Sequence, residues 1–238
     1  MIYDQLNDNS TNVIKEIKLK EFDIKSVTFR TGVAPRVIII GRRATGKTSL
    51  TAEILKNHQN LSRGTIFARL EEERLFYSSI VSNAKIHNEF NSSILEKAIK
   101  LQKQVYKQTN TGYVTDDDLK TYVILDNCLY DQNWYKDDSI RFLYTHGCVY
   151  KIMSILTMNY PYGIPPNLRS NIDYIFVLKD HYLPNRRRIW EYYCGDFIKF
   201  EDFCSIMDKN TENGNCLVIK NDRRSDNIED ILYWYKIT

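Results

Sequence analysis

Residues 41–48 constrain the fold of this chain more than any other segment does, because their sequence is Gly-Arg-Arg-Ala-Thr-Gly-Lys-Thr. It matches the pattern G-x-x-x-x-G-K-[ST], whose glycines let the backbone wrap tightly and turn its N–H groups toward phosphates. The β-branched run at 37–40 predicts a buried strand before this loop, and the apolar spacing over 48–57 predicts a helix after it. Strand, glycine-containing loop and helix in this order predict a phosphate-binding loop.

The residue types in the loop predict the binding and hydrolysis of ATP with Mg²⁺. Lys47 would place a positive charge on the β- and γ-phosphates, and the Thr48 hydroxyl would coordinate Mg²⁺. The helix that follows adds the positive end of its dipole. We expect nucleotide contacts along the whole segment: Gly41, Arg42, Arg43, Ala44, Thr45, Gly46, Lys47, Thr48 and Ser49. For Arg42 and Arg43, contact with phosphate or a neighbouring subunit and simple solvation are both open.

Composition bounds the class of protein. With 238 residues the chain is long enough for one large α/β domain with a full core. A net charge of +3 is too mild to indicate a nucleic-acid partner by itself. The five cysteines form no CxxC pair, which predicts reduced, buried thiols in a cytosolic setting rather than disulfides or a zinc site. No apolar run approaches the roughly 20 residues of a membrane span, and the polar start of the chain is no signal peptide.

The order of predicted elements indicates one α/β domain. We expect an N-terminal extension or first edge strand over 1–30 and the P-loop ATPase domain over 31–238. Strands are predicted at 65–70, 122–126, 150–158, 174–178, 216–219 and 232–235, and helices at 76–108, 139–144 and 199–208. Alternating strands and helices predict a three-layer sandwich around a mostly parallel sheet, as in P-loop NTPases.

A second carboxylate is expected from the strand at 122–126, which has the sequence Tyr-Val-Ile-Leu-Asp. An aspartate at the end of such a strand binds Mg²⁺ opposite the P-loop threonine, so Asp126 is the predicted second metal residue. Many related ATPases carry glutamate next, but here Asn127 follows and cannot accept a proton. Three explanations are therefore open: another carboxylate accepts the proton, hydrolysis is slow, or the chain binds ATP without turnover. Glu71, after the strand at 65–70, is the best substitute, although 71–73 could equally be a solvated helix start.

Several segments together resemble a known family. They are Asp126-Asn-Cys-Leu-Tyr-Asp131 with Trp134, the run Asn-Tyr-Pro-Tyr-Gly-Ile-Pro-Pro-Asn-Leu-Arg-Ser-Asn-Ile-Asp-Tyr at 159–174, Asn-Arg-Arg-Arg-Ile at 185–189 and Glu-Asp-Ile-Leu-Tyr-Trp-Tyr at 229–235. Over roughly residues 36–236 the chain resembles the genome-packaging ATPases of nucleocytoplasmic large DNA viruses, which belong to the FtsK–HerA superfamily.

The resemblance implies ATP-driven packaging of viral double-stranded DNA by a homo-oligomeric ring with a RecA/FtsK–HerA-like fold. It implies viral capsid or membrane-associated portal proteins as partners. The implied location is the host cytoplasm, at the viral factory, or the virion. It also implies that Glu71 matches the family glutamate after the second strand. Asn159 stands where the family usually has glutamine, and could hydrogen-bond the γ-phosphate or water.

One departure concerns an arginine. The family usually has Asn-Gly-Arg-His where this chain has His-Gly-Cys-Val at 146–149, so Cys148 replaces the arginine. Arg169, Arg141 or the run Arg186–Arg188 would then have to serve. Arg169, after two prolines, could act on a neighbour's γ-phosphate or only anchor its own loop. Arg186–Arg188 could contact DNA phosphates or be solvated. Asn127 and Cys148 favour a second hypothesis, a nucleotide-binding assembly factor with little turnover.

Overall fold

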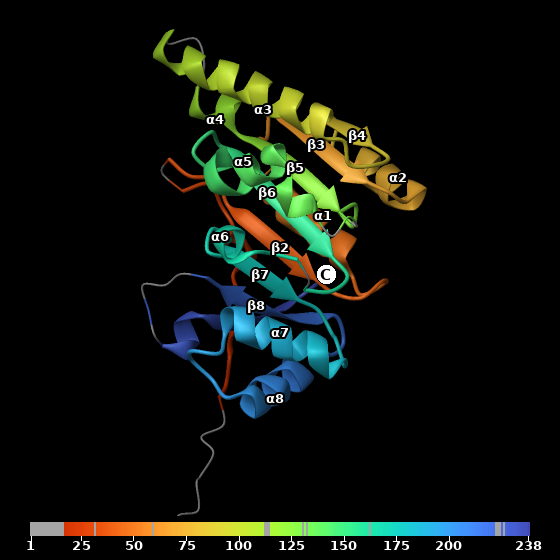
Figure 1. Ribbon diagram of the computed structural model, residues 1–238, viewed down its shortest axis with the longest axis vertical. Helices are drawn as coiled ribbons and strands as arrows, with labels where there is room; N and C mark the ends of the chain where they lie inside the picture. The colour runs from red at the N-terminus through yellow and green to blue at the C-terminus, as the bar shows by residue number, and fades with distance from the viewer. Residues whose placement is uncertain are drawn as a thin grey trace, which may run out of the picture.

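The computed structural model describes residues 17–30, 32–58, 60–111, 115–129, 131, 133–161, 163–221, 225 and 227–238. Within this part of the chain, nine strands form one sheet in the order β1-β9-β8-β7-β2-β6-β5-β3-β4 (Figure 1). The strands are β1 (Lys20–Glu21), β2 (Arg36–Ile40), β3 (Arg63–Ala68), β4 (Ala84–His87), β5 (Thr121–Asp126), β6 (Ile152–Met158), β7 (Tyr174–Val177), β8 (Asn215–Lys220) and β9 (Leu232–Lys236).

The sheet is mostly parallel. Strands β7, β2, β6, β5, β3 and β4 run parallel to one another, whereas β8 is antiparallel to both β7 and β9. The helices are α1 (Lys47–Lys56), α2 (Glu71–Ile80), α3 (Ser92–Lys107), α4 (Asp116–Leu119), α5 (Asp138–Phe142), α6 (Pro166–Arg169), α7 (Leu183–Tyr193) and α8 (Phe200–Asn210). The predicted α/β sandwich of a P-loop NTPase is confirmed.

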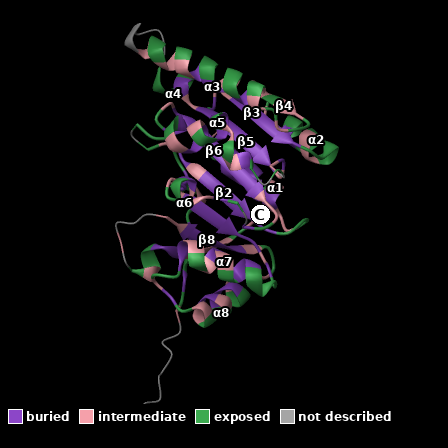
Figure 2. Cartoon of the chain, in the orientation of Figure 1, coloured by how far each residue is buried: buried purple, intermediate pink, exposed green. Residues whose placement is uncertain are grey.

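Two hydrophobic cores lie on the two faces of the sheet. Ile38 and Ile40 of β2 point into the core that contains α3, α5, α7 and α8, while Val37 and Ile39 point into the core that contains α1 and α2. Both faces of each central strand are therefore covered, which is why the strand sequences are continuous apolar runs rather than alternating ones. Figure 2 shows the central strands buried and the exposed residues gathered on the outer sides of the helices.

The region at 76–108 differs from its expectation. A mostly helical segment was predicted, but the chain forms α2, the edge strand β4 and then α3. β4 pairs only with β3 among the described strands, and its half-exposed residues Ala-Lys-Ile-His carry no apolar run. Residues 84–87 therefore form a strand because they pair with β3, and not because of their own apolar content. β3 itself ends at Ala68, two residues earlier than predicted, and Glu71 begins α2.

The described residues 17–30 pack against the domain rather than standing apart from it. β1 pairs with β9, Leu19 lies in one core, and Phe22 and Val27 lie in the other. An edge strand was one of the two expectations for this region, and β1 lies at one edge of the sheet. The division of the chain at residue 30 stays a prediction. Residues 1–16, the rest of the expected extension, lie outside the described residues. None of the described helices combines the length and apolar character needed to cross a bilayer.

Candidate active site

The predicted phosphate-binding loop connects the carboxyl end of β2 to the amino end of α1 (Figure 1). Gly41 leaves no room for a side chain, since a Cβ there would lie 2.6 Å from Thr45 Oγ1 and 2.8 Å from Leu178 Cβ. Gly46 adopts a left-handed backbone conformation with φ of 102° and caps α1. The Thr45 hydroxyl donates to the Arg42 carbonyl at 2.7 Å and closes the loop. Both pattern glycines are thus required by the shape of this turn.

Lys47 lies over the loop and joins it to the neighbouring strand. Its Nζ donates to the carbonyl oxygens of Gly41 and Arg42 at 2.8 and 2.9 Å, and to Asn159 Oδ1 at 2.9 Å. Burial lowers the pKa of Lys47, while the carboxylates of Asp126 and Glu73 act in the opposite direction. The structure therefore brings together two predicted site residues, Lys47 and Asn159, that are 112 positions apart in the sequence.

Asp126 ends β5 and is fully buried, with three hydroxyl groups around its carboxylate. It accepts hydrogen bonds from Thr48 Oγ1 at 3.2 Å, from the Tyr77 hydroxyl at 2.6 Å and from Thr157 Oγ1 of β6. Burial, followed by the charge of Asp126, raises the pKa of Tyr77 well above 10, so this hydroxyl remains a donor. Three donors satisfy a buried charge that would otherwise be costly.

The pair Thr48–Asp126 fits the expected Mg²⁺ site. A hydroxyl and a carboxylate oxygen face each other where the phosphates would lie, and hard oxygen ligands are what Mg²⁺ prefers. Among the described residues, no group of three or more His, Cys, Asp or Glu side chains could hold a metal ion alone. An ion here would complete its shell with phosphate oxygens and water, as is usual for Mg²⁺ with nucleotides. Metal binding itself stays a prediction.

The carboxylate that faces this cluster is Glu73 rather than Glu71. The Glu71 side chain is exposed at the start of α2. Glu73 Oε2 accepts the Leu70 N–H at 3.4 Å, and burial together with the charge of Asp126 raises the pKa of Glu73, against the opposite effect of Lys47 and Arg43. Glu73 and Tyr77 are one helical turn apart, so both face Asp126. In the sequence, residues 71–73 form one run of glutamates with the same local character, so Glu73 was not predicted separately from Glu71.

A cavity of about 190 Å³ adjoins the cluster at the carboxyl ends of β5 and β6. Both polar and apolar side chains line it. Its lining residues are Arg69, Asn127, Leu129, Trp134, Leu156, Thr157, Met158, Asn159 and Tyr160. Tyr77 and Thr157 were not predicted as site residues, because only the folded sheet brings them beside Asp126. Arg69, which lines the cavity, was not predicted either.

For Arg42 and Arg43, contact with phosphate or a neighbouring subunit and simple solvation both remain open. Arg42, Arg43, Ala44 and Ser49 are exposed. Arg43 is close enough to Glu73 for its charge to lower the pKa of that carboxyl.

Arg169 lies near the amino-terminal ends of the parallel strands, whereas the phosphate-binding loop lies at their carboxyl-terminal ends. It ends α6, just before the start of β7, whereas the loop follows the end of β2, and these parallel strands are about 13 Å long. Its guanidinium donates to the Ile164 carbonyl at 3.0 Å and stacks 3.8 Å above the Tyr192 ring. The nearby carboxylate of Asp173 binds Arg36. These contacts match the anchoring alternative, and action on a neighbouring copy stays a prediction.

Arg169→Ala is expected to lower the free energy of unfolding by about 1–2 kcal/mol, because the loop loses a hydrogen bond and a cation–π contact. Turnover per folded molecule should change little. Thermal melts beside steady-state ATPase rates would check both. A stable variant that binds ATP but has lost about 10³-fold in turnover would instead establish the arginine-finger role.

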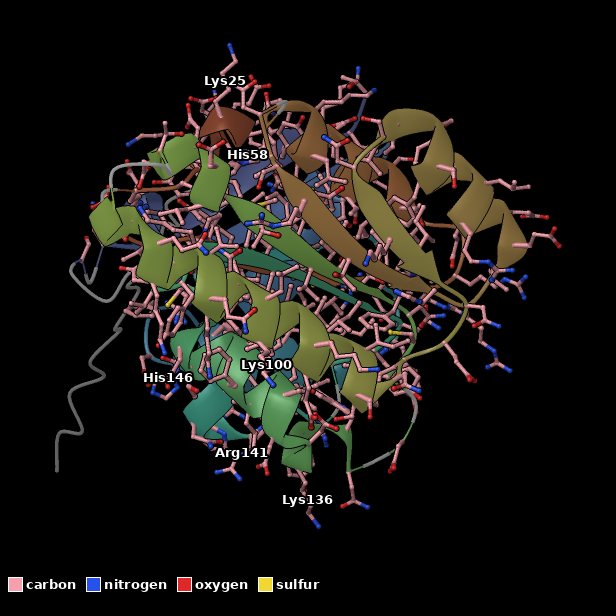
Figure 3. The ribbon with its side chains drawn as sticks, turned by 90° about the horizontal axis from the view of Figure 1, so that it is seen from above. Lys25, His58, Lys100, Lys136, Arg141 and His146 are labelled. Atoms are coloured by element: carbon pink, nitrogen blue, oxygen red, sulfur yellow. The ribbon has the colours of Figure 1, made fainter. Side chains whose placement is uncertain are left out.

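The other arginine candidates lie in different settings. Arg186 is buried, donating to the Asp180 carbonyl and pairing with Asp208 at 2.5 Å. Arg187 is exposed, with its guanidinium 4.1 Å above the Phe200 ring. Arg141 is exposed beside Asp138, at the periphery near Lys136 (Figure 3). Cys148, at the family's arginine position, is buried. A solvated Arg186–Arg188 cluster is therefore wrong for Arg186, which is held by the fold.

Comparison with known proteins finds sequence relatives of this chain in viruses. No protein-family model matches the chain. Uncharacterized protein L437 of Acanthamoeba polyphaga mimivirus is 29% identical over 226 residues, covering 93% of this chain and 78% of that protein. Uncharacterized protein 075L of Invertebrate iridescent virus 6 is 26% identical over 228 residues, covering 92% and 86% of the two chains.

Solved structures share the fold. The genome packaging NTPase B204 of Sulfolobus turreted icosahedral virus 2, in complex with AMPPCP, superposes with a TM-score of 0.58 at 16% identity, covering 86% of this chain and 98% of that one. The pCW3 conjugation coupling protein TcpA with ATPγS gives a TM-score of 0.54 at 12% identity, covering 84% and 66% of the two chains. The chain therefore shares the fold of a viral genome packaging NTPase, as the resemblance of its sequence to viral genome-packaging ATPases predicted, and its sequence relatives are viral proteins.

Proposed function

We propose that this chain is an ATPase that drives viral double-stranded DNA into a capsid as a homo-oligomeric ring. The observation that carries the ATPase assignment is the convergence of Lys47, Thr48, Asp126 and Asn159 at the carboxyl ends of β2, β5 and β6. DNA as the substrate is supported by the shared fold with a viral genome packaging NTPase and by the viral relatives. Partners at the capsid or its portal, and a location in the host viral factory or the virion, form part of the same proposal.

The site's own groups suit hydrolysis. Lys47 would exchange its contacts with the Gly41 and Arg42 carbonyls for the β- and γ-phosphates. Thr48 and Asp126 would hold Mg²⁺, which when bound neutralises charge on the phosphate oxygens. Asn159, next to Lys47, would orient the γ-phosphate or the attacking water. Water then forms a bond to the γ-phosphorus, the bond to the bridging oxygen breaks, and ADP and phosphate leave.

Glu73 is our proposed general base for this step. It faces Lys47 and Asp126, and its raised pKa makes its carboxylate a better proton acceptor than an ordinary glutamate. A proton from the attacking water would pass to Glu73, which compensates for Asn127 after the strand-end aspartate. Glu71, which matches the family position, stays the alternative.

The rival function is a nucleotide-binding assembly factor with little turnover. Asn127 in the position that often holds glutamate, and buried Cys148 in the family's arginine position, favour it. Its site would bind ATP as described, and nucleotide binding rather than hydrolysis would control assembly.

DNA-stimulated hydrolysis separates the two functions. We expect duplex DNA to raise the steady-state ATPase rate of the parent protein several-fold, with phosphate release as the readout. A single-stranded oligonucleotide of equal charge is the control for a general polyanion effect. Tight ATP binding with turnover that duplex DNA does not change would contradict the motor and support the rival.

A further inference from the structure

A cavity lies between α3 and the part of the sheet that β3 and β4 form. Its volume is about 380 Å³, which is within the range of small-molecule binding sites. Its lining comes from α3, from β4 and from the first residues of β3 and β5, whereas the phosphate-binding loop follows the carboxyl end of β2. α3 runs beside β3 and β4 at one end of the sheet (Figure 1). The cavity is therefore separate from the nucleotide site.

The wall that α3 contributes is apolar. Ile94, Ala98 and Leu101 recur at i, i+4 and i+7, so they share one face of the helix, and all three line the cavity. Leu101 is 47% exposed. The fully packed apolar positions of α3 are Leu95 and Ile99, which belong to the core. α3 therefore offers the cavity an apolar surface in addition to the one that it buries against the sheet.

The opposite wall, formed by the strands, is polar. Strand residues that face a helix in a sheet covered on both sides are usually apolar. Here Thr65 lies on the same face of β3 as the core residue Phe67, and β4 pairs Lys85 with Thr65 and His87 with Phe67. An apolar helix surface thus faces a polar strip of the sheet. Such a mismatch is found at functional sites more often than in a packed core.

The charges on this wall are positive. Among the described residues that line the cavity, Arg63, Lys85 and Lys97 are cations and none carries a carboxylate. Arg63 is partly compensated by Asp118, whose pKa is lowered mainly by hydrogen bonds from Thr115 and to a smaller extent by the charge of Arg63. Lys85 and Lys97 have no ion-pair partner within the part of the chain that the structure describes. The two lysines therefore supply uncompensated positive charge.

The acidic residues nearest in sequence lie outside the cavity lining. Glu96 is on another side of α3, where the Ser92 hydroxyl donates to its carboxylate at 3.5 Å. Glu89 follows β4 and is exposed. Burial, followed by the charge of Lys85, lowers the pKa of His87, and no carboxylate among the described groups acts in the opposite direction. The potential at this wall is therefore set by cations.

We propose that this cavity binds a small organic anion with an apolar body, of the class of alkyl carboxylates and sulfonates. The apolar body would lie against Ile94, Ala98 and Leu101, and the anionic group would lie between Lys85 and Lys97. Both lysines are exposed, so the anionic group would keep part of its hydration and avoid the cost of full burial. One ligand of this kind satisfies both walls, and the proposal does not depend on ATP hydrolysis.

Displacement of a fluorescent anion tests the site. Anilinonaphthalene sulfonate, an anion with an apolar body, would be titrated into the parent protein, and decanoate would then be added as a competitor below its micelle concentration. We expect saturable binding of the probe and its displacement by decanoate. Acetate, which lacks the apolar body, and decyltrimethylammonium, which has the opposite charge, are the controls for the two parts of the ligand. Neither should displace the probe.

Charge reversal at the cavity supplies the variants. The double variant Lys85→Glu with Lys97→Glu should bind decanoate about 10-fold or more weakly, because two modest attractions become repulsions. Lys100→Glu with Lys107→Glu is the matched control, since it makes the same change in net charge at exposed positions of α3 outside the cavity, and it should bind like the parent (Figure 3). Ala98→Phe fills the cavity without a charge change and should also weaken binding. Circular dichroism would show that each variant is folded.

Several results would overturn the proposal. They are the absence of saturable binding to the parent, equal affinity of the parent and the folded Lys85→Glu, Lys97→Glu protein, and displacement by decyltrimethylammonium as effective as that by decanoate. Displacement by duplex DNA that requires the same two lysines would assign them to nucleic-acid phosphates and would overturn it as well. No measurement here uses ATP, so a failed site and a failed motor function remain distinguishable.

Discussion

Lys47→Ala is expected to reduce ATP turnover by about 10³-fold or more, because the phosphates lose the cation that the loop holds over them. In the structure this ammonium group has three oxygen acceptors, the Gly41 and Arg42 carbonyls and Asn159 Oδ1. Circular dichroism would show whether the variant keeps its fold. Phosphate release would measure turnover, and calorimetry would measure ATP affinity.

Lys56→Ala is the matched control for this variant. Lys56 is exposed at the last turn of the same helix, so its loss removes equal charge without touching the loop. We expect parent-like rates from it. A Lys47→Ala protein that hydrolyses ATP at the parent rate would refute the site assignment.

Glu73→Gln is expected to lower turnover by roughly 10²-fold or more while ATP affinity stays close to that of the parent. The change keeps the shape of the side chain and removes only its ability to accept a proton. Glu71→Gln, two residues earlier on the same helix, is the matched comparison and should keep nearly full activity because Glu71 is exposed. The opposite outcome, with Glu71→Gln inactive and Glu73→Gln active, would return the base to the family position.

The pH profile gives an independent check on Glu73. A general base acts only when deprotonated, so turnover should fall as pH falls through its pKa. Burial and the charge of Asp126 raise the pKa of Glu73, so the acid limb of the profile should lie above the ordinary glutamate value of 4.5. The Glu73→Gln variant should lack this limb in its residual activity.

Local sequence pattern was sufficient for the central part of the site. The residues of the loop, its strand and its helix are contiguous, so sterics and hydrophobic spacing predict them together. Asp126 ends a further apolar strand and was predicted from that pattern, whereas Asn159, directly after β6, was predicted only through the family resemblance. Parallel strands place their carboxyl ends on the same side of the sheet, which brings both residues to one site. That is why residues far apart in sequence could be assigned to one site without coordinates.

The strand order and helix phase were beyond the sequence pattern. Three consecutive glutamates have the same local character, and only the packing of Tyr77 against Asp126 turns Glu73 inward while Glu71 stays in solvent. Thr157 became a partner of Asp126 because β6 pairs with β5. β4 was missed for the same reason, since its strand structure depends on pairing with β3 rather than on its own apolar content.

The arginines show most clearly what the sequence determines and what only the tertiary structure decides. The sequence by itself determined that this chain has a loop of the phosphate-binding pattern between a strand and a helix, because that pattern needs only neighbouring residues in a defined order. Only the tertiary structure decided which charges could serve there. It placed Arg169 near the amino-terminal ends of the parallel strands, buried Arg186 against Asp208 and left Arg187 exposed at the start of α7. The physical reason is that the role of a guanidinium depends on the end of the strands at which it lies and on the residues that contact it. Both are set by contacts between segments that are distant in the chain.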